Sequence, residues 1–363
     1  MKIQRALFSQ NSARSEMAWP AVIRLALTRV APVLVHSKVG LLLLGIMLFA
    51  GLSACRRTEE MEKVTLRLGA PHSVEWVGFY AAQLEGYYAA ENLDVTILSA
   101  DDRSPSEDVL SGAADFGVMS GGDLLLARTR SEPLVAISAI LRRSPLAVMA
   151  FAETGITKPR DLRLKRVGVI SSDMRTVKDV QFIALMEQVS VTLEGFGVVP
   201  VGEDGVMPLV NQRVDAIAYA SAIREAVFAR EAGYEFTLSY FSDYGVLEYP
   251  YVIFADVSTV EQRSDLTARF VRATLAGYHY ALTHPARVAE MTSSYDPTLN
   301  MEEQQAIWQA VIPFLDTGDV LVGTMEEGVW QSTQTVFLNY GLMDTPVVLN
   351  DLYTNQFVVR SDY

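Results

Sequence analysis

The chain has 363 residues, half of them apolar, and a formal net charge of −13. Such a length allows two or three domains with sizeable cores. Residues 1–54 hold six of the 30 basic residues and one of the 43 acidic ones, so the remaining body is strongly acidic. An acidic body repels the phosphates of nucleic acids and of anionic lipids, and we expect neither as its direct partner.

An apolar run, residues 39–54, ends at Cys55, the only cysteine of the chain. The run follows basic residues, is short for a transmembrane helix and closes with small residues, as a signal peptide does. The sequence Leu-Ser-Ala-Cys at residues 52–55 resembles a bacterial lipobox, in which the cysteine becomes the lipidated first residue of the mature protein. We therefore expect residues 1–54 to be a signal peptide, with Met17 as an alternative start, and residues 55–63 to be a tether. The alternative is a retained membrane anchor.

A single cysteine at the lipidation point also excludes disulfides, cysteine-based metal sites and a cysteine nucleophile in the body.

After the tether, short apolar strands alternate with helical stretches. Strands are expected at 64–69, 94–98, 115–119, 134–141 and 146–151, and helices at 78–91, 104–112 and 122–130. This alternation favours a parallel sheet flanked by helices. The pattern restarts near Thr154, with strands at 166–170, 198–201 and 215–219 and helices at 175–189, 205–212 and 221–232.

A further strand is expected at 249–254, and from Thr259 the chain is mostly helical. We therefore predict an α/β protein of two lobes, the first formed by residues 64–152 and 250–363 and the second by residues 153–249. A cleft between two such lobes is a favoured place for a small-molecule site.

Catalytic signatures are missing from the sequence, which contains no G-x-S-x-G, H-E-x-x-H, Walker A or G-x-G-x-x-G motif. We predict no catalytic residues, no metal ligands and no cofactor. His72, at the end of the first strand, is either a ligand contact or a structural histidine.

Aromatic residues gather where the first strand ends: Trp76, Phe79 and Tyr80 follow Glu75. Large rings at the carboxyl end of a strand can sandwich a flat heterocycle. The alternative is that these rings belong to the core.

Other candidate ligand contacts lie at the ends of later strands. Ser120 precedes a helix that begins near Asp123, and Ser172 occupies the corresponding place in the second lobe. Free amides at a helix N-terminus donate hydrogen bonds to polar or anionic atoms. The alternative is that Asp123 is only a helix-start residue. Glu225 either accepts hydrogen bonds from a ligand amine or complements the helix dipole. Tyr219, beside it, and Tyr249, near the hinge, complete the predicted site.

Several blocks of the sequence resemble a known family. They are GFYAAQLEGYYAAENLDV, DVLSGAADFGV, ITKPRDLRLKRVGV, RVDAIAY and RFVRATLAGYHYALTHP. In this order they are similar to the extracytoplasmic substrate-binding proteins of ABC importers, in the branch that includes binders of thiamine-pyrimidine precursors, riboflavin, aliphatic sulfonates, taurine and nitrate. The resemblance implies the periplasmic-binding-protein type II fold.

The resemblance also implies a lipid-anchored, extracytoplasmic monomer that closes on a small heteroaromatic molecule and delivers it to a membrane permease with a cytoplasmic ATPase. Glu225 matches the glutamate with which the pyrimidine-precursor binders contact their ligand. Trp76 replaces the histidine of those binders, which leaves riboflavin as an alternative to a hydroxymethylpyrimidine precursor. A sulfonate, taurine or nitrate is another alternative ligand. A pyrimidine synthase of the same fold and a periplasmic sensor are further alternatives; the synthase needs a cysteine-rich motif that this chain lacks.

Overall fold

The structure, a computed structural model, describes residues 60–318 and 320–359. The predicted signal peptide, the lipidation residue Cys55 and the first part of the tether lie outside these residues. All elements below belong to one compact unit, Glu60–Tyr363. None of the helices in the described ranges is both long enough and apolar enough to cross a membrane.

The first of two five-stranded sheets has the strand order β2-β1-β3-β10-β4. Its strands are β1 (Glu62–Arg67), β2 (Leu93–Leu98), β3 (Phe116–Met119), β4 (Leu134–Ala139) and β10 (Val252–Asp256). β1 pairs in parallel with β2 and β3, whereas β10 runs antiparallel to β3 and β4. Every residue of the central strand β3 is buried, as expected for a strand covered on both faces. The edge strand β4 is buried throughout as well, and an isolated bridge joins its Ala136 to Tyr353.

Helices α3 (Val77–Leu84), α4 (Tyr87–Ala90), α5 (Pro105–Leu110) and α6 (Gly121–Thr129) connect the early strands of this sheet. After β10 come α10 (Val257–Gln262), α11 (Ser264–Thr283), α12 (Val288–Ser293), α13 (Met301–Leu315) and α14 (Glu327–Asn339). The long helix α11 packs directly on α3, where a Cβ atom at Gly277 would lie 2.0 Å from the carbonyl oxygen of Gly78. This close approach requires glycine.

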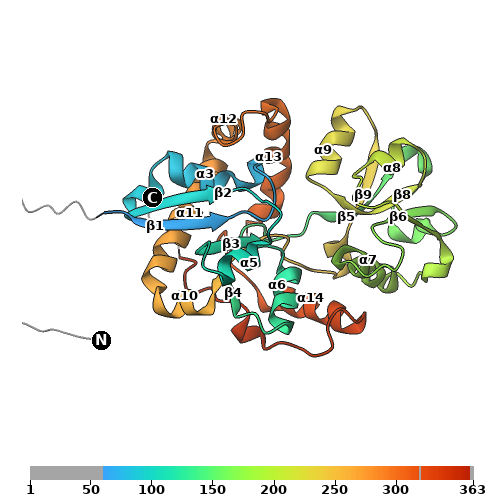
Figure 1. Cartoon of the computed structure of the whole chain (residues 1–363). Coiled ribbons are helices and arrows are strands. Elements are labelled where there is room, and N and C mark those ends of the chain that lie inside the picture. Colours follow the sequence, from blue (N-terminus) through green and yellow to red (C-terminus); the bar gives the residue numbers. More distant parts are fainter. Residues whose placement is uncertain (1–59, 319, 360–363) are drawn as a thin grey trace, which may run out of the picture. The chain divides into compact units, whose positions relative to one another are not determined.

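The second sheet has the order β7-β6-β8-β5-β9, formed by β5 (Leu146–Phe151), β6 (Arg166–Val169), β7 (Gly197–Pro200), β8 (Ala216–Ser221) and β9 (Phe236–Tyr240). β6 is parallel to β7 and β8, and β5 is antiparallel to β8 and β9. Figure 1 shows α7 (Val177–Gln188), α8 (Met207–Val210) and α9 (Arg224–Glu231) gathered around this sheet.

The chain crosses between the sheets twice, through residues 140–145 and residues 245–251. Each crossing delivers a strand that runs antiparallel in its new sheet: β5 in the second and β10 in the first. This differs from the predicted boundary after residue 152, because β5 bonds to β8 and β9 and so belongs to the second lobe. An apolar strand between two lobes carries no local signal of the sheet it will join.

Two further differences concern single elements. The helix expected over 78–91 is divided into α3 and α4 at Gly86, whose φ of +80° ends the first helical segment. The edge strand β9, which is half-buried throughout, was not expected from the sequence. Its sequence, Phe-Thr-Leu-Ser-Tyr, alternates apolar and polar residues as a half-buried strand does, so the signal was present in the sequence.

Two apolar clusters form the cores. One fills the first lobe between its sheet, α3, α11 and α13, and the other lies mainly around the second sheet and extends to α6 and α14. Ile223 and Val227, from the start of α9 in the second lobe, belong to the cluster of the first lobe and are almost fully buried. The two lobes are therefore in direct apolar contact beside the crossings.

Candidate functional site

A cavity of about 490 Å³ lies between the two sheets, and both lobes contribute to its lining. The first lobe supplies residues that follow β1 and β3, such as Gly69 and Ser120, and the second supplies residues at the end of β8, such as Tyr219 and Ser221. Ligand sites of open α/β sheets lie at these carboxyl ends. Because Leu146 pairs with Ser221 and Val252 with Met119, both crossings also adjoin the cavity.

Tyr219 presents the clearest unsatisfied group of the cavity. Its side chain is 5% exposed, and its hydroxyl is buried with no hydrogen-bond partner in the described part of the chain. Burial raises the pKa of Tyr219, and the neighbouring Asp204 and Glu225 raise it further, so the hydroxyl stays protonated. A buried hydroxyl without a partner is costly, and a ligand acceptor or donor in the cavity would remove that cost.

Glu225 lies in the first turn of α9 and faces the same cavity. One carboxylate oxygen, Oε2, accepts a hydrogen bond of 2.9 Å from the backbone N–H of Ser221. This bond fixes the carboxylate beside the end of β8. The structure is compatible with both roles considered for Glu225. The carboxylate bonds to the local backbone at the start of α9, and it also borders the cavity, where a ligand could contact it.

The cavity is acidic. Its lining holds two cations, and each is in an ion pair: Lys178 Nζ lies 2.7 Å from Glu203, and Arg224 Nε donates to Glu75 Oε2 at 2.8 Å. The second pair joins the lobes, since Glu75 follows β1 and Arg224 begins α9. Glu75 is 3% exposed. Three further carboxylates border the cavity, those of Asp123, Glu225 and Glu248.

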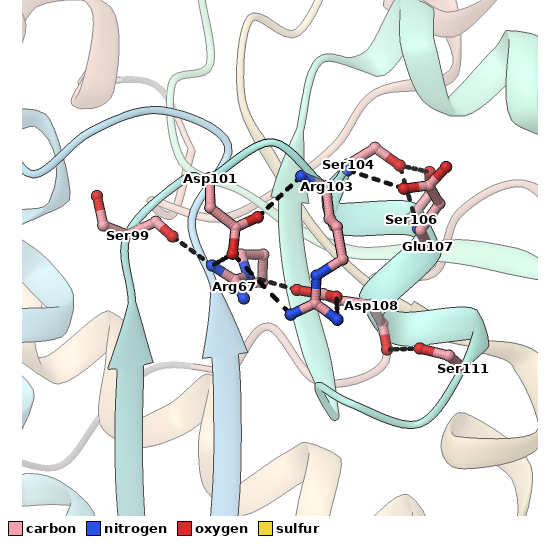
Figure 2. Close-up of polar contacts among 9 residues, drawn as sticks. All are labelled: Arg67, Ser99, Asp101, Arg103, Ser104, Ser106, Glu107, Asp108 and Ser111. Atoms are coloured by element: carbon pink, nitrogen blue, oxygen red, sulfur yellow. Dashed lines mark hydrogen bonds and ion pairs between the residues drawn. The ribbon is translucent and has the colours of Figure 1, made fainter.

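Pro105, the first residue of α5, lines the cavity. Figure 2 shows the polar contacts of a buried arginine that holds the loop before α5. Arg67, at the end of β1, donates from Nε to Asp108 Oδ2 at 2.5 Å and lies 3.1 Å from Asp101. Arg103 lies 3.1 Å from the other oxygen of Asp108. A capping box between Ser104 and Glu107 starts α5 in the same loop. The loop after β2 is thus held to β1 and α5 by paired charges.

The predicted helix N-termini are closed by the protein itself. Ser120 borders the cavity, but its hydroxyl accepts the N–H of Asp123 at 3.0 Å and donates to the Asp123 carboxylate. The N–H groups of Gly121 and Gly122 are taken by Tyr249 O and Glu248 Oε1. The first amides of α6 are therefore bonded within the chain and do not face the cavity as free donors.

Ser172 does not line the cavity; it lies in an exposed loop after β6. The buried carboxylate of Asp179 takes the donors beside it, the N–H groups of Ile170 and Ser171 at 2.9 and 3.0 Å. It also accepts hydrogen bonds from the hydroxyls of Ser171 and Thr176. The carboxylate of Asp179 therefore occupies the place at this end of the second lobe where a bound anion would accept hydrogen bonds.

The three predicted rings of the first lobe are fully buried in the core and do not line the cavity. Trp76 donates to Pro71 O at 3.0 Å and packs edge-on against Tyr251, with ring centres 4.7 Å apart. Phe79 packs on Tyr278. Tyr80 stacks on Tyr295 at 4.0 Å and bonds to His72, 2.9 Å away, so His72 is a partner in that cluster.

Tyr249 is also buried; its hydroxyl accepts the N–H of Glu326 at 2.6 Å and its ring packs against Trp330. It lies in the second crossing, as predicted, but outside the cavity lining. The neighbouring Tyr251 and Glu248, which were not predicted from the sequence, line the cavity instead. The signal that could have found them is their position in Glu-Tyr-Pro-Tyr, directly before a strand.

The two mixed sheets, the two crossings and the cavity between the lobes define the periplasmic-binding-protein fold. The periplasmic aliphatic sulphonate binding protein SsuA from Escherichia coli has this fold: it superposes with a TM-score of 0.64 at 11% identity, over 81% of this chain and 93% of that one. The desulfurization enzyme DSZB superposes with a TM-score of 0.58 at 17% identity, over 82% of this chain and 97% of that one.

Residues 73–288 match the family model described as NMT1/THI5 like, and the chain belongs to this family. Its relatives include the riboflavin-binding protein RibY of Chloroflexus aurantiacus, 24% identical over 84% of this chain and 88% of that protein. The formylaminopyrimidine-binding protein of Halalkalibacterium halodurans is 24% identical over 82% of this chain and 91% of its own length. A 4-amino-5-hydroxymethyl-2-methylpyrimidine phosphate synthase of Aspergillus parasiticus is 20% identical over 77% of this chain and 82% of its own length.

Proposed function

We propose that this chain is the solute-binding component of an ABC importer, held outside the cytoplasm by a lipid on Cys55, and that it binds a small heteroaromatic molecule. A hydroxymethylpyrimidine precursor of thiamine is the first candidate ligand and riboflavin the second. The relatives named as binders of riboflavin and formylaminopyrimidine support this class of ligand. Membrane permease and ATPase subunits would be the partners.

The observation that carries the proposal is the buried, unpartnered hydroxyl of Tyr219 in the cavity. Buried polar groups of folded proteins almost always have a partner in the protein, in ordered water or in a ligand, so this hydroxyl can bond to a polar ligand atom that enters the cavity. With Glu225 beside it, the second lobe offers a hydroxyl and a carboxylate at the end of one strand. Ring nitrogens and exocyclic amines of heterocycles are matched acceptors and donors for these two groups.

The charge of the lining separates the ligand classes found among the relatives. A sulfonate or nitrate needs unpaired cations or free amides, whereas Lys178 and Arg224 are in ion pairs and the first amides of α6 are bonded internally. Asp123 and Glu225 add negative charge. An anion would be repelled and an amine-bearing heterocycle attracted, while an uncharged heterocycle would meet no such repulsion.

The mechanism implied is closure of the two lobes on the ligand. A molecule that contacts Tyr219 of the second lobe and Ser120 of the first binds more tightly to the closed form, and this difference in affinity shifts the population towards it. The Glu75–Arg224 pair and the buried Ile223 would strengthen the closed form by joining the lobes. A permease would recognise that closed surface.

The synthase relatives keep an enzyme on the same fold as the second candidate function. A synthase of the kind the resemblance implied depends on a cysteine-rich motif, and Cys55 is the only cysteine of this chain. Export of the body would also separate it from cytoplasmic pools. A binding protein therefore agrees better than an enzyme does with the single cysteine and the expected export of this chain.

The experiment is a calorimetric titration of an aminopyrimidine and of riboflavin into the protein and into its Glu225→Gln variant. We expect the variant to bind at least tenfold more weakly, about 1.4 kcal/mol, because the amide cannot accept charge-assisted hydrogen bonds. The matched control is Glu231→Gln, an exposed residue at the end of the same helix, which should keep the affinity. Equal affinity in Glu225→Gln and wild type would refute this assignment of the site.

A further inference from the structure

The second crossing, residues 245–251, contains a buried carboxyl group that touches both lobes. Glu248 lies in the middle of the crossing, is 8% exposed and borders the cavity. The segment leads from a 3-10 turn of the second lobe, Phe241–Tyr244, to β10 of the first. Any rotation of one lobe relative to the other therefore involves this segment.

Each oxygen of Glu248 bonds to a different lobe. Oε1 accepts the N–H of Gly122, the second residue of α6 in the first lobe, at 3.1 Å. Oε2 accepts a hydrogen bond from the side-chain amide of Gln181, on α7 of the second lobe. The first contact requires glycine, because a Cβ atom at residue 122 would lie 2.6 Å from Oε1 and 2.8 Å from the ring of Phe337. One carboxyl group thus ties α6 to α7.

The amide of Gln181 has a second hydrogen-bonding arrangement available. It is 2% exposed, and its Oε1 atom is buried without a partner in the described residues, while its Nε2 atom donates to Glu248. A half-turn of the amide would present Oε1 to Glu248, which a protonated carboxyl could then donate to. The pair is therefore compatible with both protonation states of Glu248.

The groups around Glu248 favour the protonated state. Burial raises the pKa of Glu248 to about 7, and the nearby carboxylate of Asp123 on α6 raises it too. The hydrogen bonds from Gln181 and Gly122, and the charge of Lys178 on α7, lower the pKa but do not offset burial. In water the same carboxyl would have its ordinary pKa near 4.5.

We propose that Glu248 is a proton-linked tie between the two lobes: closing the cleft buries this carboxyl and takes up a proton, and opening the cleft to water releases it. The coupling uses the crossing itself and does not depend on which ligand occupies the cavity. Between the ordinary and the raised pKa, the closed form holds a proton that the open form lacks, so a fall in pH favours closure and a rise in pH through 7 removes this contribution.

The test measures lobe separation in the absence of ligand, so that it stands apart from the proposed function. Cysteines replace the exposed Leu84 at the end of α3 and Leu164 in the second lobe, in the full chain with Cys55→Ser, and carry a spin-label pair. We expect the ratio of closed to open molecules to rise by up to tenfold for each unit that the pH falls between about 7 and 4.5.

Two variants locate the effect. Glu248→Gln keeps the shape of the side chain and cannot titrate, so its ratio should be constant from pH 5 to 8 once its melting temperature shows that it is folded. Glu231→Gln should retain the wild-type dependence. A wild-type ratio that does not change with pH would overturn the proposal without any variant, and so would a Glu248→Gln protein that responds to pH as wild type does.

Discussion

At the scale of single residues, the hydroxyl of Tyr219 bonds to no group in the described part of the chain. We predict that Tyr219→Phe leaves the free energy of unfolding unchanged or raises it by up to about 1 kcal/mol, because it removes a buried polar atom without a partner. Ligand affinity should fall roughly tenfold, since a hydrogen bond to the ligand is lost. Chemical denaturation and calorimetry measure the two effects.

A hydroxyl with an internal role would give the opposite result for Tyr219→Phe: lower stability with unchanged affinity. Tyr249→Phe is the matched control, because its hydroxyl accepts the N–H of Glu326 and its removal should lower stability. Comparing the two tyrosines therefore separates a ligand contact from a structural contact.

Three predicted residues, Ser120, Tyr219 and Glu225, line the cavity, and they could be found because each lies at or just after the end of a strand. Trp76, Phe79 and Tyr80 also follow a strand, yet they lie in the core. Sequence places such rings near a strand end but does not give the direction of each side chain. The ligand roles of the predicted residues remain proposals.

At the scale of elements, the starts of α6 and α7 are completed by the chain's own side chains. Asp179 is 1% exposed and accepts hydrogen bonds from two backbone amides and two hydroxyls at the end of β6. From the sequence, Ser172 was expected to contact a ligand at the start of α7. The acceptor that closes this turn lies several residues later, inside the helix, where sequence spacing does not reveal it.

We predict that Asp179→Ala lowers the free energy of unfolding by about 3 kcal/mol, because it leaves several buried donors without an acceptor. The nearby Asp173 is exposed and accepts only local hydrogen bonds, so Asp173→Ala should cost well under 1 kcal/mol. Urea denaturation of both variants provides the comparison. Similar losses for the two would contradict the role given to Asp179.

At the scale of the whole described unit, the alternation of strands and helices was sufficient to predict two α/β lobes, and the resemblance to a known family implied the periplasmic-binding-protein fold. The crossings were harder to predict. The first one is the short segment 140–145, which lies before β5 and not after it. Sheet membership depends on long-range pairing, such as that of Leu146 with Ser221, which no local pattern encodes. The second crossing was placed near Tyr249, and Glu248, the residue beside it, ties the lobes.

We expect the acidic cavity between the lobes to bind an uncharged or amine-bearing heterocycle and to reject anions. The most direct test is calorimetric titration of one protein preparation with riboflavin, an aminopyrimidine and an aliphatic sulfonate. We predict a dissociation constant for at least one heterocycle that is a hundredfold or more below that of the sulfonate, about 2.7 kcal/mol. Tighter binding of the sulfonate than of either heterocycle would contradict the claim.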